Sequence, residues 1–418
     1  MKKREHLVRA IAPPGSVCVI CKGTKYLCGK PSCPLLLKYY KLIKTVSIVD
    51  ERIYGSSPPG VFVGSKNYPK IFAGPLIPPF LGDTAILDFP EKWINFNIEK
   101  IVDFRTKLIR GMRVVDVSSA SIPDKYVEDL QVLAMSRSAV DSDVLFAHRP
   151  TGKIVLSSDV QPFGPSGKIE KFRFYESKVD SRIEKFYYDD LKAEYAVVSL
   201  YTKGVEVTKI QRCFSVGIFG EEKRRKLVPT RWAITAVDDI ISGYLVSKIK
   251  RYSIIDNYEV YVSDRMENIF AVIFIPDAWS YELVESWHSG TLWNPTENTY
   301  IISDHELYWG RKTYAQIGGC YYAARLAVAE KLESLKRQAS VVVLREAKPS
   351  YILPIGVWHV RENVRAALKS KPRKFDDFGE VLEYLRKIFT VSPEKFLENS
   401  YILKFHAKQG RIEKWLNT

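Results

Sequence analysis

Short hydrophobic runs separated by prolines and glycines characterise the first part of the chain. Between residues 56 and 82, runs such as 61–63 alternate with Pro and Gly, which exclude long helices there. Residues 98–134 have a mostly helical pattern, and extended patterns return over residues 144–160. Most of the long helical patterns come later in the chain. We therefore expect an α+β fold with a mixed, multi-segment body.

The second half contains strands and helices that are recognisable from their hydrophobic periodicity. Residues 258–262 and 269–275 are rich in β-branched and aromatic residues and predict a strand pair. Residues 341–344 predict a short buried strand, and residues 359–369 have a helical pattern. Gly318-Gly319 precedes another helix with one apolar side, which consists of Tyr321, Ala324, Val328, Leu332 and Leu335.

A basic loop runs directly into a further predicted helix. Thr235 and Asp238 form a capping-box-like start, and apolar residues follow at helical spacing, namely Ile234, Val237, Ile241, Leu245 and Ile249. Cations near a helix N-terminus lie where an anion is already favoured. Four residues are therefore candidates for phosphate or nucleic-acid contact, with a solvated charged loop as the alternative: Arg224, Arg225, Lys226 and Arg231.

Two other segments could also contact phosphate. The loop after Val63 contains Gly64, Lys66 and Lys70, so backbone N–H groups and charge could reach an anion, although a plain connecting loop explains the pattern too. Residues 305–314 and 359–365 contribute four further candidate cations: Arg311, Lys312, Arg361 and Arg365. If these segments converge with residues 226–231, they form a basic pocket.

Aromatic residues are concentrated between residues 279 and 300. Aromatic rings near Lys and Arg suit stacking on nucleic-acid bases. The alternative is that they fill the hydrophobic core, as most aromatic residues do. The residues concerned are Trp279, Tyr281, Trp287, Trp293 and Tyr300.

Composition favours a basic globular protein of two or three domains. The 418 residues are 46% hydrophobic and 12% aromatic, which is ample for large cores. An excess of 63 Lys and Arg over 48 Asp and Glu gives a net charge of +15 and favours polyanionic partners such as DNA. A merely soluble basic surface is the alternative reading.

The N-terminal residues, the apolar runs and the cysteines together indicate the compartment in which the protein is expected. Four of the first six residues are charged, no secretory apolar segment follows them, and no later run is long and apolar enough to cross a bilayer. Six cysteines, four of them clustered, indicate a reducing environment in which thiols remain available for a metal. We expect a cytoplasmic protein without membrane contact.

Four cysteines within the first few dozen residues predict a structural zinc site. Cys18, Cys21, Cys28 and Cys33 form two short loops that can supply four thiolates to a tetrahedral Zn²⁺. The second pair is spaced by four residues instead of two, so a disulfide pair or an Fe–S cluster stays open. Because every ligand position is taken by Cys, an open catalytic zinc is not expected.

Candidate catalytic residues are few. Asp238, Asp239 and His305 could act as acid, base or metal ligand, although helix capping is the simpler role for the aspartates. The chain lacks a P-loop, a HExxH helix and a dense carboxylate cluster of the kind that binds two Mg²⁺ ions.

The C-terminal residues have the spacing of a clamp-binding peptide. Gln409 is followed three residues later by Ile412, then by Trp415 and Leu416, which one helical turn places on the same side. These apolar side chains would fill a pocket on the sliding clamp (PCNA), and Gln409 would bond at its rim. The alternative is a final helix that folds back into the core.

Several long segments resemble the archaeal Nre DNA-repair family. The resemblance rests on residues 225–239, the cysteine cluster, the loop over residues 63–75, residues 161–165, 318–325 and 354–365, and the extreme C-terminus. It covers essentially the whole chain. It implies a cytoplasmic repair protein that binds the sliding clamp, and it brings no catalytic residue set.

The expected organisation follows from this resemblance. It comprises a zinc knob with its docking helix (1–45), an N-terminal conserved region (46–282), a C-terminal conserved region (283–395) and a clamp-binding tail (396–418). Two functional classes remain open. One is a clamp-associated, DNA-binding repair factor without chemistry of its own. The other is an enzyme that hydrolyses phosphodiester or N-glycosidic bonds in DNA or a nucleotide-like ligand.

Overall fold

The computed structural model describes residues 8–11, 21, 26, 33–155, 161–175, 177–289, 291, 294 and 298–416. These residues form two compact units that divide between Ile240 and Ile241, inside helix α8 (Thr230–Ile249). Each unit is built around its own six-stranded sheet, which confirms the α+β expectation. No helix in the described ranges is long and apolar enough to span a membrane.

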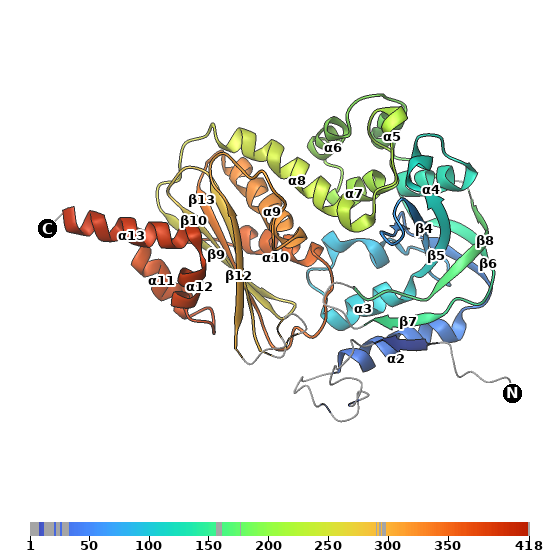
Figure 1. The fold of residues 1–418 in the computed structure, drawn as a ribbon, viewed down its shortest axis with the longest axis horizontal. Helices are drawn as coiled ribbons and strands as arrows, with labels where there is room; N and C mark the ends of the chain where they lie inside the picture. Colours follow the sequence, from blue (N-terminus) through green and yellow to red (C-terminus); the bar gives the residue numbers. More distant parts are fainter. Residues whose placement is uncertain are drawn as a thin grey trace. The chain divides into compact units, whose positions relative to one another are not determined.

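Unit 1 contains a sheet with the strand order β2, β6, β8, β5, β4, β3 (Figure 1). Neighbouring strands are antiparallel except β5 and β8, which are parallel. The strands are β2 Arg52–Ser57, β3 Val61–Val63, β4 Lys70–Ile77, β5 Ile109–Asp116, β6 Val140–Phe146 and β8 Ser166–Phe174. A separate parallel pair consists of β1 Val8–Ile11 and β7 Gly152–Val155.

Three of the described α-helices of unit 1 are capped at their first turn by polar side chains, those of Asn97, Asp124 and Asp180. Asp124, for example, accepts a hydrogen bond from the Val127 backbone at the start of α4, and Val127, Leu130 and Ala134 are fully buried at helical spacing. The α-helices before α8 are α2 Pro34–Ile48, α3 Ile98–Lys107, α4 Lys125–Met135, α5 Ser181–Tyr187, α6 Ala193–Thr202 and α7 Val207–Ser215. The 3-10 helices are η1 Ala85–Asp88, η2 Pro90–Lys92, η3 Val117–Ala120 and η4 Glu222–Arg224.

Unit 2 contains a sheet with the order β12, β11, β13, β10, β9, β14. Only β11 and β13 are parallel neighbours. The strands are β9 Tyr258–Arg265, β10 Asn268–Ile275, β11 Ser280–Trp287, β12 Tyr300–Glu306, β13 Ser340–Ala347 and β14 Arg373–Phe375. Strands β9, β10 and β13 confirm the strands predicted at 258–262, 269–275 and 341–344. Every residue of β10 and β13 is buried.

Helices cover both faces of the unit 2 sheet (Figure 1). On one face lie α9 Gly319–Leu335 and α10 Trp358–Lys369. On the other lie α11 Phe378–Arg386, α12 Pro393–Asn399 and α13 Tyr401–Leu416. On this second face, the strand residues Ala271 and Val342 form a buried cluster with Val381, Phe396 and Leu403 of the helices. The first turns of α13 are thereby fixed to the sheet.

Two expectations about local structure were wrong. Residues 98–134 are interrupted by strand β5, because this segment pairs with β4 and β8. Gly111 permits that close packing, since a Cβ atom there would lie 2.3 Å from Ile169 Cδ1. Helix α8 begins at Thr230 directly after Pro229, so Thr235 and Asp238 lie inside the helix and do not cap it.

Candidate nucleic-acid interface

Three segments of unit 1 that are distant in sequence meet at the start of α8. The Val63 backbone N–H at the end of β3 donates to Thr230 Oγ1 at 3.1 Å, which connects the β3–β4 hairpin to the first residue of α8. Val117 N donates to the Pro69 carbonyl at 3.0 Å, and Leu227 N donates to the Val117 carbonyl at 2.8 Å. The loop over residues 64–69 and the basic segment 224–231 therefore lie side by side.

An exposed aromatic pair lies where these segments meet. The rings of Tyr68 and Trp232 are 5.6 Å apart with their planes inclined by 45°. The two residues are 48% and 52% exposed. Four exposed cations share their segments: Lys66, Lys70, Lys226 and Arg231. We call these six residues the aromatic–basic face.

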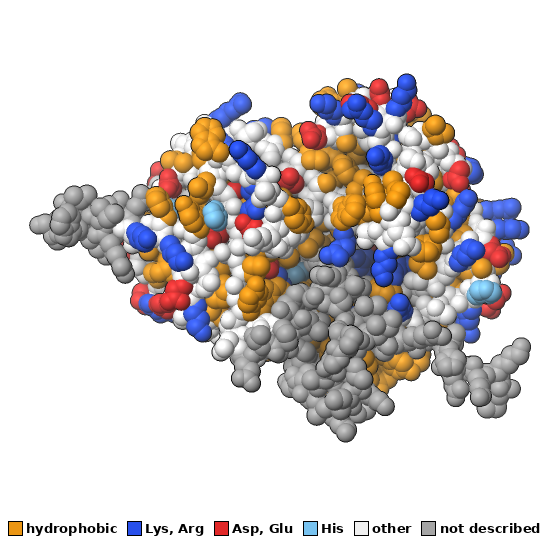
Figure 2. Space-filling model, in the orientation of Figure 1, with side chains coloured by type: hydrophobic (Ala, Val, Ile, Leu, Met, Phe, Trp, Pro, Cys, Tyr) orange, Lys and Arg blue, Asp and Glu red, His pale blue; other side chains and the backbone are white. Residues whose placement is uncertain are grey.

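A nearby carboxylate, that of Asp116, reduces the positive charge of this face at Lys70. Asp116 lies close enough to Lys70 to interact with it electrostatically, and its pKa is lowered mainly by hydrogen bonds from the Ser118 hydroxyl and backbone N–H. It therefore stays ionised at neutral pH. Figure 2 shows Lys and Arg side chains next to exposed hydrophobic side chains on unit 1. Rings beside cations can stack on bases while the cations contact phosphates.

Two cations of the basic segment have other roles. Arg225 is buried, and its guanidinium donates to the carbonyls of Gly220 (2.8 Å), Tyr187 (2.7 Å) and Asp189 (2.6 Å). These contacts occupy its donors, so Arg225 holds chain segments together and is not presented to a phosphate. Arg224 is exposed and forms a 3.2 Å ion pair with Glu221.

The aspartates of α8 do not form an accessible acidic pair. Asp238 is fully buried and accepts a 2.8 Å hydrogen bond from Gln211 Nε2 inside the core. Asp239 is exposed on the next position of the helix. Consecutive helical residues point about 100° apart, so the two carboxylates do not share one site.

In unit 2, two of the candidate site residues on β12 and in the loop after it contact other residues of the unit. Arg311 forms a bidentate ion pair with Asp304, with N–O distances of 2.5 and 3.0 Å. The His305 ring stacks on Tyr401 of α13, with centroids 4.3 Å apart. Lys312 is exposed. The His305 ring and the Arg311 guanidinium are therefore each engaged with other residues of unit 2.

The two α10 arginines lie in a network of ion pairs. Arg365 contacts Glu330 of α9 at 2.6 Å and Glu362 at 2.8 Å. Arg361 is fully buried, and its Nε is 3.2 Å from Glu362. These cations therefore neutralise carboxylates within unit 2, so neither is an open phosphate contact.

Sequence reasoning missed a buried polar network beside α9 and α10. Arg345 donates to Glu285 Oε1 (2.7 Å), to Asn268 Oδ1 (2.9 Å) and to His359 Nε2 (3.1 Å). Burial, and then the nearby Arg345 charge, lower the pKa of His359 to about 3, so the ring is neutral. Burial also raises the pKa of Cys320, so its thiol is not an activated nucleophile. The polar groups of the network are therefore paired with one another inside unit 2.

The aromatic residues between 279 and 300 mostly lie in the core. Trp279, Tyr281 and Trp287 are buried, which confirms for them the reading that they fill the core rather than stack on bases. Tyr300 is half exposed at the start of β12, and Trp293 lies outside the described residues. The stacking candidates are instead Tyr68 and Trp232, which share segments with cations but are far apart in sequence.

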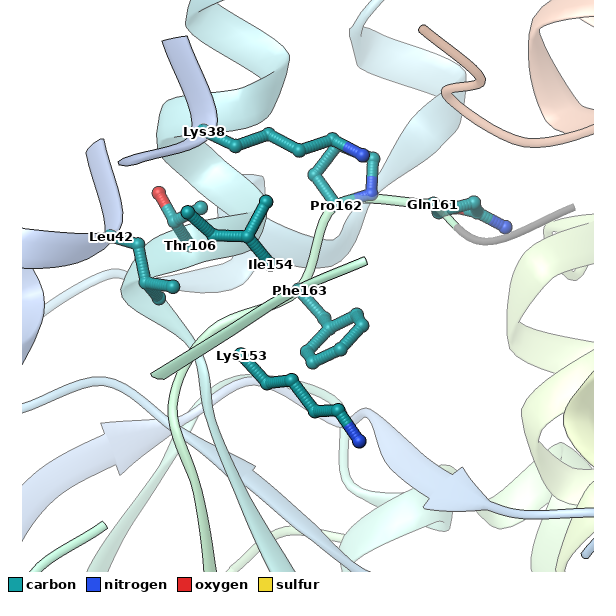
Figure 3. Close-up of a pocket in the computed structure, with 8 residues that line it drawn as sticks. All are labelled: Lys38, Leu42, Thr106, Lys153, Ile154, Gln161, Pro162 and Phe163. Atoms are coloured by element: carbon teal, nitrogen blue, oxygen red, sulfur yellow. The ribbon is translucent and has the colours of Figure 1, made fainter. Parts of the chain in front are cut away.

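Unit 1 also contains a small pocket between α2, β7 and the segment after Gln161 (Figure 3). It holds about 230 Å³ of empty space, part of it open to solvent. In Figure 3 the Lys38 side chain extends toward Pro162, and Lys153 extends to the opposite side. Burial lowers the pKa of Lys38 to about 8. Gln161, which lines the pocket, accepts a 2.8 Å hydrogen bond from Arg105.

Of the four cysteines that were predicted to bind zinc, only two lie within the described residues. Cys21 is buried, and Cys33 is the residue before the first turn of α2. Cys18 and Cys28 lie outside the described residues. In the portion of the chain that the structure covers, no three Cys, His, Asp or Glu side chains are arranged to hold a metal.

The predicted clamp-binding residues fall on the last turns of α13, which runs to Leu416. The side chains of Gln409, Ile412, Trp415 and Leu416 lie outside the described part of the structure. The earlier turns are described, and there Ile402 and Leu403 are buried against the unit 2 sheet.

Comparison with known proteins shows similarity along almost the whole chain. A family model described as archaeal Nre, N-terminal matches residues 27–294, and one described as archaeal Nre, C-terminal matches residues 306–415. DNA repair protein NreB of Archaeoglobus fulgidus is 39% identical over 93% of this chain and 97% of its own length. DNA repair protein NreA of the same organism is 40% identical over 87% and 92%.

A third relative comes from another archaeon. DNA repair protein NreA of Haloferax volcanii is 31% identical over 83% of this chain and 85% of its own length. No solved structure is significantly similar to the chain.

Proposed function

Because this chain belongs to the archaeal Nre family, we propose that it is a DNA-repair protein that contacts DNA through the aromatic–basic face and binds the sliding clamp through its C-terminal residues. Relatives that are named DNA repair proteins align with most of the chain, which supports the repair role. The observation that carries the DNA contact is the exposed Tyr68–Trp232 pair, which the fold assembles among four exposed cations.

The face suits a strand with accessible bases. Base–aromatic stacking contributes about 1–3 kcal/mol per base and tolerates any sequence, because every base has a π-face. Cations around the rings add affinity by releasing counterions from phosphates, with a slope of log affinity against log salt of about −0.7 per phosphate for single strands. Single-stranded or unpaired DNA is therefore the proposed ligand, and binding should depend strongly on salt.

The test separates the rings from the charges. Trp232→Ala should weaken binding of a fluorescent single strand by about tenfold or more without changing the salt slope. Lys226→Ala with Arg231→Ala should instead flatten the slope by about one to two. Tyr188→Ala is the matched control, since Tyr188 is an exposed aromatic residue of unit 1 outside the face. Unchanged affinity and slope in all folded variants would refute the DNA contact.

Clamp binding is proposed from the spacing of Gln409, Ile412, Trp415 and Leu416. The buried start of α13 would hold this peptide at the end of a fixed helix, which reduces the entropy lost on binding. Trp415 is the expected anchor, because a buried aromatic residue carries much of a small interface. Trp415→Ala and removal of residues 409–418 should each abolish clamp capture in a titration. Clamp binding retained by both variants would show that recognition lies elsewhere.

A closed zinc site is the proposed role of the four N-terminal cysteines. Four thiolates suit tetrahedral Zn²⁺. The bound ion would organise the N-terminal segment, which is too short to build a hydrophobic core of its own. Cys33 directly precedes α2, so a metal bound there would fix the chain at the start of that helix.

A further inference from the structure

A strongly exposed tryptophan lies on a tight turn in unit 2, directly after β12. Trp309 is 91% exposed, more than any other large hydrophobic residue in the described chain. The turn is closed by a 2.8 Å hydrogen bond from Gly310 N to the Leu307 carbonyl. Gly310 has a φ of +79°, a left-handed conformation that glycine adopts without strain. The geometry of the turn thus directs an indole ring into solvent.

Arg311 stabilises the turn by hydrogen bonds to residues on either side of it. Its Nη1 donates to Asp304 Oδ1 (2.5 Å) and to the His305 carbonyl (2.8 Å), and its Nε donates to the Thr313 carbonyl (3.1 Å). These contacts join the strand before the turn to the chain after it. Arg311 was expected to bind phosphate, but in the structure it fixes the turn. A ring on a fixed turn loses little conformational entropy when it binds a partner.

The surroundings of Trp309 are aromatic and cationic. Tyr308 packs edge-on against it, with centroids 5.2 Å apart at 90°. Lys250 Nζ lies 4.8 Å from the centre of the Tyr308 ring, and Lys312 is exposed in the same loop. The adjacent carboxylate of Asp304 is held by Arg311 and by the Gln316 backbone.

The second nearby carboxylate is also neutralised. Glu306 is buried and accepts hydrogen bonds from Arg325 (2.9 Å) and Trp279 (3.2 Å). The charge that the loop offers to a partner is therefore positive. An exposed ring on a loop that also carries cations matches a base with its adjoining phosphates.

We propose that the turn carrying Trp309 is a base-stacking element, in which the indole stacks on an unpaired base of DNA. This inference rests on the proposed DNA-repair function. Bases within an intact duplex are already stacked on their neighbours, so the available ligand is a base in a single strand, a gap or a distorted site. Lys312 and Lys250 supply charge for the flanking phosphates.

The experiment compares two single strands of equal length and charge. One carries all its bases, and the other has a central run of abasic positions. Full-length protein with Trp309→Ala should bind the normal strand about fivefold or more weakly than wild type, with an unchanged salt slope. It should bind the abasic strand as wild type does. Trp309→Phe should recover part of the loss, because a smaller ring still stacks.

Controls separate this inference from the proposed function. Ile122→Ala removes another strongly exposed apolar side chain, 86% exposed in unit 1, and should have no effect. Trp232→Ala and the Trp415 variant test the proposed function independently. Equal affinity of wild type and Trp309→Ala for the normal strand would overturn the stacking role, as would equal weakening on both strands. Loss of clamp binding alone would assign the turn to a protein partner and would also overturn it. A wild-type protein that binds neither strand would contradict both proposals.

Discussion

Individual cations in this chain have different roles that their residue type does not reveal. Lys226 and Arg231 are exposed at the start of α8, whereas Arg225, next to Lys226 in the sequence, is buried and satisfied by three carbonyls. Arg345 and Arg361 lie inside unit 2. Part of the positive charge lies on buried cations that bond to internal acceptors. The number of cations available to DNA is therefore smaller than the net charge suggests.

Replacing Arg225 tests this distinction between neighbours. Arg225→Ala leaves three carbonyls without their donor and should lower the free energy of unfolding by about 2–4 kcal/mol. Lys226→Ala should change it by less than about 0.5 kcal/mol, because that side chain is exposed. Urea denaturation followed by circular dichroism measures both. Equal stability of the two variants would mean that Arg225 contributes no more than a surface residue.

The buried His359 makes stability depend on pH. Its pKa is about 3 in the folded protein, whereas an unfolded His has a pKa of about 6.5. Between these values the unfolded chain binds a proton that the folded protein does not. Stability should therefore fall as the pH drops below about 6.5, at up to about 1.4 kcal/mol per pH unit from this group.

Urea midpoints between pH 7 and pH 5 test this expectation. His359→Gln should reduce the dependence on pH, because glutamine cannot take up a proton. His148→Gln, at an exposed position, should retain the wild-type dependence. An identical pH profile for wild type and His359→Gln would contradict the assignment.

At the scale of elements, a strand residue caps the last helix. Glu282 of β11 accepts hydrogen bonds from Ser400 Oγ (2.6 Å) and from the backbone N–H groups of Tyr401 (2.8 Å) and Ile402 (2.9 Å), at the start of α13. A carboxylate at a helix N-terminus is favourable, and here it also attaches the helix to the sheet. The orientation of the proposed clamp-binding peptide therefore depends on β11.

Glu282→Ala should loosen α13 and leave the sheet intact. We expect a loss of about 1–3 kcal/mol, because three donors lose their acceptor. Hydrogen exchange should become faster in α13 and stay unchanged in β10. Ser303→Ala, which removes a hydrogen bond to the Asn399 carbonyl, is a milder control at the same junction. Unchanged exchange in α13 would show that its apolar contacts alone fix it.

Hydrophobic periodicity predicted helices and strands well where one face of the element, or the whole element, is buried. The stripe on α8 is an example, since Val237, Ile241 and Leu245 are all buried. Strand β5 was missed, because its conformation is imposed by pairing with strands on both sides. Both segments of the aromatic–basic face were noted in the sequence as candidates for phosphate contact, but long-range hydrogen bonds bring Tyr68 next to Trp232. Contacts of that kind have no signal in a single sequence.

At the scale of the whole molecule, the zinc proposal concerns how the N-terminal segment is organised. Protein prepared with zinc should contain about one Zn²⁺ per chain, and Cys18→Ser should lower that content. Metal analysis and protease sensitivity of the N-terminal segment measure the two effects. Cys213→Ser is the control, because Cys213 is buried in unit 1 and burial raises its pKa to about 11. Zinc-free protein with a stable N-terminal segment would contradict the proposal.

DNA that binds on the aromatic–basic face would shield the backbone there from solvent. Hydrogen–deuterium exchange of the full-length protein with and without a single strand tests this contact most directly. We expect slower exchange in peptides that cover residues 64–70 and 226–233, and loss of this protection in the Trp232→Ala variant. Protection confined to other segments, or none at a DNA concentration that saturates binding, would contradict it.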